Sequence, residues 1–177
     1  FAFGGSCLPK DLRAIVYRAQ QADVEVPILR ATLESNRIQI DRALRMVLAT
    51  GHRRVGILGM SFKEGTDDLR ESPMVALIEQ LIGKGLDLHI YDRDVSESRL
   101  MGANREYIER EIPHIWTLMR PTMADVMTRA ETILIGNGSP EFRTIPEQLG
   151  THQILIDLVG VSRSATAGDP RYQGIAW

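Results

Sequence analysis

The chain has only one cysteine, no long hydrophobic run and no excess of charge of either sign. A single cysteine excludes a disulfide within the chain and favours a reducing compartment, so a cytoplasmic protein is expected. No apolar run approaches the roughly 20 residues of a membrane-spanning helix, and no charged-then-apolar leader resembles a signal peptide. The 21 basic and 23 acidic residues give a net charge of -2, which predicts neither nucleic acid nor an anionic membrane as a partner.

Metal binding and serine catalysis also lack their usual sequence patterns. No G-x-S-x-G motif is present, and no metal-ligand spacing links the four histidines, His52, His89, His114 and His152. With 177 residues the chain is long enough for one domain with a core and a helical extension. Phe1 is not an initiator methionine, and the chain opens inside a sequence typical of a ligand-binding loop. We therefore expect the C-terminal portion of a longer protein.

Apolar residues at helical spacing predict two helices before residue 50. The first begins near Pro9 and ends near Ala22, and the second runs from about Pro27 to Ala49. The second helix would be on the order of 35 Å long. Its apolar residues partly wrap round it, which favours a subunit or domain interface over an ordinary core helix.

A different pattern begins after Gly51, where short apolar strands alternate with helices. Strands are expected at 54–59, 86–92, 132–135 and 153–158, and helices at 73–83, 104–111, 123–130 and 145–149. An irregular turn is expected at Pro113. This alternation predicts an α/β fold with a parallel sheet covered by helices on both faces.

The single cysteine lies in an unusual local setting. Cys7 follows paired glycines and stands just before the first predicted helix, with Lys10 one turn further on. The positive end of a helix and a nearby cation both favour the thiolate over the thiol. Free cysteines are nevertheless often buried and inert. The residues alone leave both interpretations open.

The loop between residues 59 and 73 follows the first strand, where open α/β sheets bind ligands. It lacks the G-x-G-x-x-G spacing of a dinucleotide site, but it carries Lys63 and Arg70 ahead of a helix with Ser72 as its expected N-cap. That combination suits a phosphate or a carboxylate, and a solvated loop with capping residues is the alternative. Asp92, at the end of the second strand, is a weakly indicated candidate for binding a ribose.

Two segments together resemble the nucleotide-diphosphate-sugar 6-dehydrogenases. The first is Phe3-Gly4-Gly5-Ser6-Cys7-Leu8-Pro9-Lys10-Asp11, and the second contains Ser61-Phe62-Lys63 and Thr66-x-Asp68-x-Arg70-x-Ser72-Pro73. The resemblance covers essentially the whole chain. Within the family, further stretches at 65–73, 102–109, 134–138 and 174–177 look most like the members that oxidise GDP-mannose to GDP-mannuronate, an alginate precursor.

The resemblance implies a three-part enzyme whose NAD-binding Rossmann domain would precede Phe1. Residues 1–50 would form a central helical region through which a homodimer assembles, and residues 51–177 would form a Rossmann-like nucleotide-sugar-binding domain. The family oxidises the sugar C6 alcohol to a carboxylate in two hydride transfers to NAD. By itself, the present chain would be an inactive dimerisation and binding module.

The resemblance also implies a role for individual residues. Cys7 matches the catalytic thiol, which forms a thiohemiacetal and then a thioester with the sugar. Asp11 matches an aspartate that we interpret as orienting the hydrolytic water. The matched binding positions are Phe1, Gly4 and Lys63 for the nucleotide sugar, and Lys10 and Arg70 for NAD.

The ending of the last predicted strand bears on the choice of substrate. UDP-glucose dehydrogenases often carry an arginine just after the aspartate of this strand, whereas Asp157 is followed here by Leu158-Val159-Gly160. This favours GDP-mannose, but Arg163 nearby keeps a UDP-sugar 6-dehydrogenase as the alternative.

Overall fold

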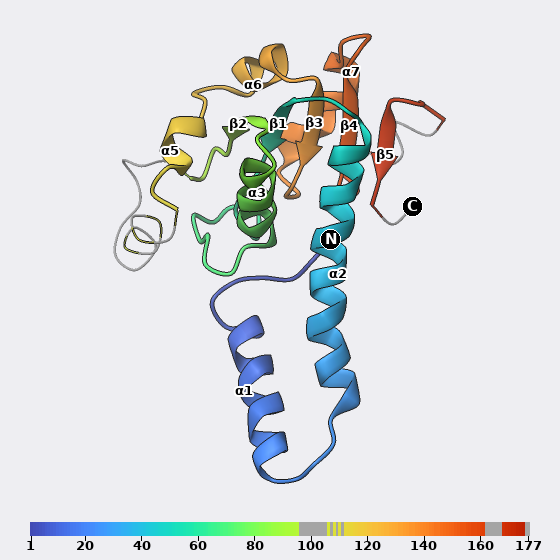
Figure 1. The fold of residues 1–177 in the computed structure, drawn as a ribbon. Helices are drawn as coiled ribbons and strands as arrows, with labels where there is room; N and C mark the ends of the chain where they lie inside the picture. Colours follow the sequence, from blue (N-terminus) through green and yellow to red (C-terminus); the bar gives the residue numbers. More distant parts are fainter. Residues whose placement is uncertain (96–105, 107, 109, 111, 162–167, 176–177) are drawn as a thin grey trace.

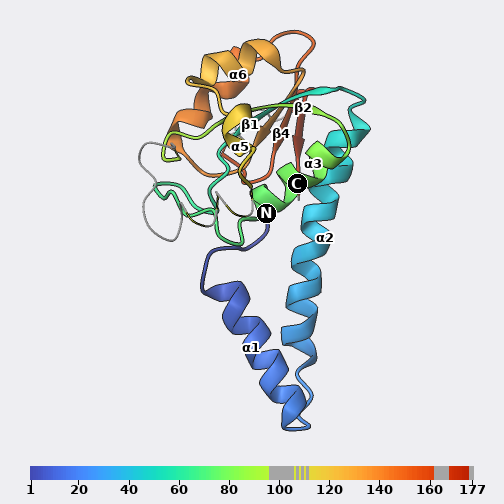
Figure 2. The same cartoon turned by 60° about the vertical axis from the view of Figure 1, so that its left-hand side comes forward.

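The computed structural model describes residues 1–95, 106, 108, 110, 112–161 and 168–175. Its first two helices, α1 (Leu8–Gln21) and α2 (Pro27–Ala49), form a hairpin that projects from the rest of the molecule (Figures 1 and 2). Both helices confirm the sequence prediction. Pro9 lies in the first turn of α1, where the missing N–H costs no hydrogen bond.

The rest of the chain is built on a five-stranded, fully parallel sheet with the order β2-β1-β3-β4-β5. Its strands are β1 (Arg54–Leu58), β2 (Asp87–Tyr91), β3 (Thr132–Ile135), β4 (Ile154–Asp157) and β5 (Tyr172–Gly174). The direction of strand addition reverses between β1 and β3. The carboxyl ends of these two strands therefore form the crevice where sheets of this kind bind ligands.

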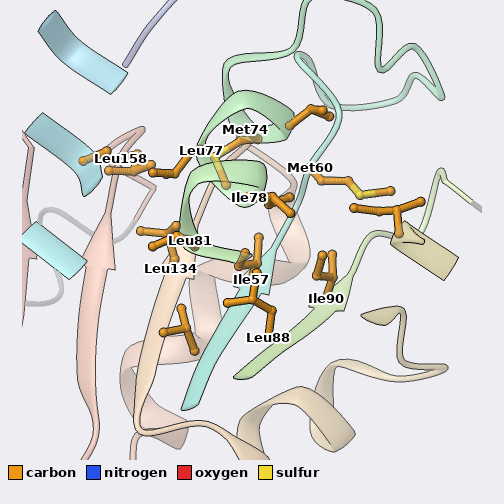
Figure 3. Close-up of a cluster of buried hydrophobic side chains, with 14 of the residues drawn as sticks. Ile57, Met60, Met74, Leu77, Ile78, Leu81, Leu88, Ile90, Leu134 and Leu158 are labelled. Carbon is orange, nitrogen blue, oxygen red and sulfur yellow. The ribbon is translucent and has the colours of Figure 1, made fainter. Parts of the chain in front are cut away.

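Helices cover both faces of the sheet, as the sequence predicted. On one face, α3 (Pro73–Gly83) and the C-terminal part of α2 pack over Ile57 and Leu134. Figure 3 shows Leu77 and Leu81 of α3 on this side. On the other face, α6 (Met123–Arg129) and α7 (Ile145–Gln148) cover Leu58 and its neighbours. Successive strand residues thus enter opposite cores.

Several short elements differ from the sequence prediction. The turn expected at Pro113 is present, and a short helix that was not expected, α5 (Ile115–Leu118), follows it. The 3-10 helix η1 (Pro140–Thr144) and strand β5 were not expected either. The helix predicted at 104–111 lies mostly outside the described residues. Neither η1 nor β5 contains a continuous apolar run, which is the signal that predicted the other short elements.

Ser72 occupies the predicted N-cap position of α3, but its side chain does not cap the helix. Its Oγ donates instead to the carbonyl oxygen of Met60 at 2.8 Å. This bond ties the two ends of the loop after β1 together. Within the described ranges, no helix is long and apolar enough to cross a membrane.

Candidate functional site

A cavity of about 330 Å³ lies at the carboxyl ends of β1 and β3. The loop after β1 contributes Lys63 and Glu64 to its lining, and the segment after β3 contributes Gly136 and Asn137. The two segments approach closely, because a Cβ on Gly136 would meet the carbonyl oxygen of Gly59. The cavity therefore coincides with the ligand crevice expected from the strand order.

The Lys63 loop is anchored by a buried carboxylate, Asp92, at the end of β2. Its Oδ2 accepts hydrogen bonds from the N–H groups of Met60 (2.8 Å) and Ser61 (3.1 Å), and from Asn137 Nδ2 (3.4 Å). Its Oδ1 accepts from the N–H of Asp94 at 3.0 Å. Both oxygens are thus used within the protein, so Asp92 is a loop anchor and its weakly indicated ribose role is not supported.

Lys63 itself is exposed. Its carbonyl oxygen accepts a hydrogen bond from Ser61 Oγ at 2.9 Å, which fixes the backbone and leaves the ammonium group available to the cavity. Glu64 adds a carboxylate to the same wall. An anionic ligand would have to approach from the Lys63 side.

The opening segment, residues 1–7, packs directly on the loop after β1. A Cβ on Gly4 would meet the carbonyl oxygen of Glu71, and would lie 2.6 Å from Cδ of Pro73. Gly5 has a positive φ of 89° and lies against the ring of Phe62. Only glycine combines this conformation with such close approach. Phe1, at the start of the segment, reaches the 330 Å³ cavity.

Cys7 is exposed at the N-cap position of α1, so it is not a buried core cysteine. Its Sγ lies 3.8 Å from Ser6 Oγ, and its carbonyl oxygen accepts the N–H of Asp11 at 2.9 Å. The Asp11 carboxylate pairs with Lys10 at 3.3 Å. Both side chains of this pair are well exposed, so the pair contributes little to stability.

Arg70 stands within electrostatic range of Cys7. Its Nε and Nη2 donate to the two carboxylate oxygens of Asp68, each at 2.8 Å. These bonds to Asp68 raise the pKa of Arg70, and the charge of Cys7 adds to the effect. Burial alone would raise the pKa of Asp68, but hydrogen bonds from Arg70 hold it below its ordinary value. Nη1 of Arg70 makes no hydrogen bond with the described residues.

Among the described residues, Lys10 and Arg70 are candidates to hold NAD. Lys10 is exposed in the first turn of α1, and Arg70 keeps one guanidinium nitrogen available near Cys7. Cations placed at the exposed thiol fit an anionic dinucleotide. Across the described ranges, no cluster of three or more histidine, cysteine or acidic residues could hold a metal.

Sequence reasoning assigned no site role to three residues that shape the site. Glu71 has a φ of 54°, which is rare for a residue other than glycine, and its carboxylate takes two hydrogen bonds from Arg13 of α1. Asn137 links the two cavity walls through Ser61 Oγ at 3.1 Å. Asn36 binds the opening segment from α2. For Asn137, the flanking glycines just after a strand were an available signal.

Two sequence profiles of one family match the chain. The UDP binding domain of the UDP-glucose/GDP-mannose dehydrogenase family matches residues 56–164, which include Lys63 and Arg70. The central domain of the same family matches residues 1–38, which include Cys7.

Curated relatives of known name extend over the whole chain. The GDP-mannose 6-dehydrogenases of Pseudomonas savastanoi pv. phaseolicola and Pseudomonas aeruginosa are 48% and 46% identical over 177 residues. These residues make up 100% of this chain and 40% of each relative. A UDP-glucose 6-dehydrogenase of Haloferax volcanii is 30% identical over 88% of this chain and 35% of its own length.

Solved structures agree with these relatives. A ternary complex of GDP-mannose dehydrogenase from Pseudomonas aeruginosa matches with a TM-score of 0.92 and 46% identity, covering 100% of this chain and 40% of that one. A UDP-glucose dehydrogenase from Pyrobaculum islandicum matches with a TM-score of 0.78 and 26% identity, covering 99% of this chain and 38% of that one. The present chain thus spans about 40% of the length of the relatives it matches most extensively. By these profiles, relatives and folds, the chain belongs to the UDP-glucose/GDP-mannose dehydrogenase family.

Proposed function

We propose that the protein containing this chain oxidises GDP-mannose to GDP-mannuronate in two NAD-dependent steps, supplying a precursor of alginate. The observation that carries the proposal is the packing of the opening segment, with Cys7, on the loop that bears Lys63 and Arg70. A nucleophile, an anion-binding lysine and a second cation are thereby gathered at one edge of the sheet. The identities of 46–48% with GDP-mannose 6-dehydrogenases support the choice of substrate.

Binding is assigned to the two walls of the cavity. Lys63 would pair with the diphosphate of the nucleotide sugar, and Phe1 and Gly4 of the opening segment would border the sugar. Lys10 and Arg70 would hold NAD on the Cys7 side. NAD, when bound, supplies the acceptor for the two hydrides that leave the sugar C6.

Cys7 would carry the covalent chemistry. After the first oxidation, its thiolate adds to the C6 aldehyde and forms a C–S bond, giving a thiohemiacetal that cannot diffuse away. Loss of the C6 hydrogen as a hydride converts this adduct into a thioester. Water, oriented by Asp11, then attacks the thioester carbon, the C–S bond breaks, and a carboxylate and the thiol result.

The test compares unaltered protein with Cys7→Ser and Lys63→Ala in the full-length enzyme. Cys7→Ser is expected to lose NADH production from GDP-mannose, and near-normal turnover would contradict the covalent mechanism. Lys63→Ala should raise KM for the nucleotide sugar about tenfold or more, because a charge-assisted contact is lost. Unchanged KM and kcat would show that the loop is structural. Lys63→Arg, which keeps the charge, is the matched control.

A UDP-sugar 6-dehydrogenase is the alternative within the same family, since a UDP-glucose 6-dehydrogenase is 30% identical. Parallel measurements of kcat/KM with GDP-mannose and UDP-glucose separate the two substrates. A further alternative is that the chain alone binds nucleotide sugar without turnover. Calorimetry with GDP-mannose tests this, and absence of heat would mean that the rest of the protein supplies the affinity.

A further inference from the structure

One side chain of α2 fastens the backbone of the opening segment. Asn36 Oδ1 accepts a hydrogen bond from the N–H of Phe3 at 2.8 Å, and Asn36 Nδ2 donates to the carbonyl oxygen of Phe3 at 3.0 Å. A single amide thus satisfies both polar groups of one residue, as a neighbouring β-strand would. We call this pair of hydrogen bonds between Asn36 and Phe3 the clamp. It is half-buried, so water competes for these hydrogen bonds only in part.

Two hollows border this part of the segment. A hollow of about 710 Å³, bordered by Phe1 and Ile28, lies on one side of the clamp. A second hollow of about 470 Å³, bordered by Arg13, lies on the other, and Asn36 lines both. Figures 1 and 2 show the segment leaving the side of α2 and crossing to the start of α1. Between the two hollows, the hydrogen bonds to Phe3 hold the path of the chain.

Phe3 lies between the two parts of the segment that would meet the substrate. Phe1 reaches the cavity before it, and Cys7 begins α1 after it. A shift of Phe3 is therefore passed to the thiol. Misplacement of a reacting group by about 1 Å can lower turnover by about 100-fold.

We propose that Asn36 is a positioning residue, which holds the Cys7 thiol at the sugar C6 through the backbone of Phe3. This inference rests on the proposed function. Asn36 binds neither substrate nor NAD in this scheme and acts only through the opening segment. The Lys63 loop has its own anchor in Asp92, so kcat should respond more than KM for the nucleotide sugar.

The experiment removes the clamp without changing the size of the side chain greatly. In the full-length protein, Asn36→Leu should lower kcat with GDP-mannose about tenfold or more, while KM changes less than about threefold. Hydrogen–deuterium exchange of the peptide covering residues 1–7 should become faster. Asn36→Asp keeps an acceptor for Phe3 N–H but places an oxygen against the Phe3 carbonyl, so it should also lower kcat.

Gln39→Leu is the matched control, because Gln39 is a half-buried amide on the same helix that makes no side-chain hydrogen bond within the described residues. It should leave kcat and exchange unchanged. Unchanged kcat in Asn36→Leu, or unchanged exchange of residues 1–7, would overturn the positioning role. An equal fall in kcat in the Gln39 variant would also overturn it. Absence of GDP-mannose turnover in the unaltered protein would instead refute the proposed function.

Discussion

Local partners decide which charged side chains at the site remain available to a ligand. Asp92 uses both carboxylate oxygens to anchor the loop after β1. Arg70 uses two of its nitrogens on Asp68, whereas Lys63 has only its backbone held. Among the described residues, neither the Lys63 ammonium group nor the remaining nitrogen of Arg70 has a hydrogen-bond partner, so both can meet an anion. The sequence alone does not show which of these four charged residues pair within the protein.

Neighbouring charged groups also set the protonation of a buried residue, His89 of β2. Arg120 Nη2 lies 3.0 Å from His89 Nδ1, and because arginine only donates, Nδ1 must accept. The ring proton is then on Nε2, which lies 3.6 Å from Asp87. Burial lowers the pKa of His89. Asp87 raises it in part, and Arg120, Arg129 and Arg54 lower it further.

The lowered pKa of His89 predicts a loss of stability in mild acid. The unfolded chain takes up a proton as pH falls below about 6.5, and the folded protein resists it, so protonation favours unfolding. Above that pH, the contribution of His89 to the free energy of unfolding is constant. We expect the urea midpoint to fall between about pH 7.5 and about pH 5.5, and to fall less in His89→Gln. His152→Gln, at an exposed position, should keep the full change. An identical fall in all three proteins would contradict the prediction.

At the scale of elements, the site depends on how the loop after β1 meets two other segments of the chain. The opening segment meets the loop after β1 at Gly4 and Gly5, and the segment after β3 meets the same loop at Gly136. Each contact is backbone against backbone or ring. A loop in this position can therefore be displaced by a single methyl group.

Gly4→Ala tests this contact. The new Cβ would overlap the Glu71 carbonyl and Pro73, so the opening segment must shift. We expect a loss of about 1–3 kcal/mol in unfolding free energy, typical of overpacking, and reduced turnover. Gly83→Ala, at the end of α3, meets no described atom within 4 Å and should raise stability by up to about 0.5 kcal/mol. Equal effects of the two substitutions on urea unfolding would contradict the claim that the contact at Gly4 leaves no room for a methyl group.

At the scale of the whole molecule, the helical hairpin projects beyond the sheet (Figure 1). It carries exposed apolar residues. Ile28 and Ile38 of α2 are 78% and 50% exposed, and Ile15 of α1 is 52% exposed. Exposed apolar side chains on a projecting element favour a surface that is covered in the assembled protein. We infer that α2 contributes to a homodimer.

Ile28→Glu is expected to weaken that dimer, because it would bury a charge in an apolar interface. Light scattering coupled to gel filtration of the full-length protein should show a shift toward monomer. Lys84→Glu, a charge change at the exposed C-cap of α3 and outside the hairpin, should leave the mass unchanged. A dimer of unaltered strength in Ile28→Glu would exclude this part of α2 from the interface.

The sequence by itself determined the elements whose signal is local and repeated. The helices α1, α2 and α3 carry apolar residues at helical spacing, and the strands β1 to β4 are short, mostly apolar runs, so their positions follow from the sequence pattern. Helices on both faces follow from the alternation of these elements. The setting of Cys7 before a helix was likewise readable, because an N-cap is a local feature.

Only the tertiary structure decided how these parts meet. Strand β5 and helix η1 lack a continuous apolar run, and their neighbours support them: β5 pairs with β4, and Phe142 of η1 packs in the core beside Ile145. Asp92 binds the backbone of Met60, which lies 32 positions away in the chain. Asn36 binds the backbone of Phe3, which lies 33 positions away. No local pattern encodes such pairs. They follow from the parallel sheet, which brings successive strand ends to one edge, and from α2, which returns the chain alongside its own beginning.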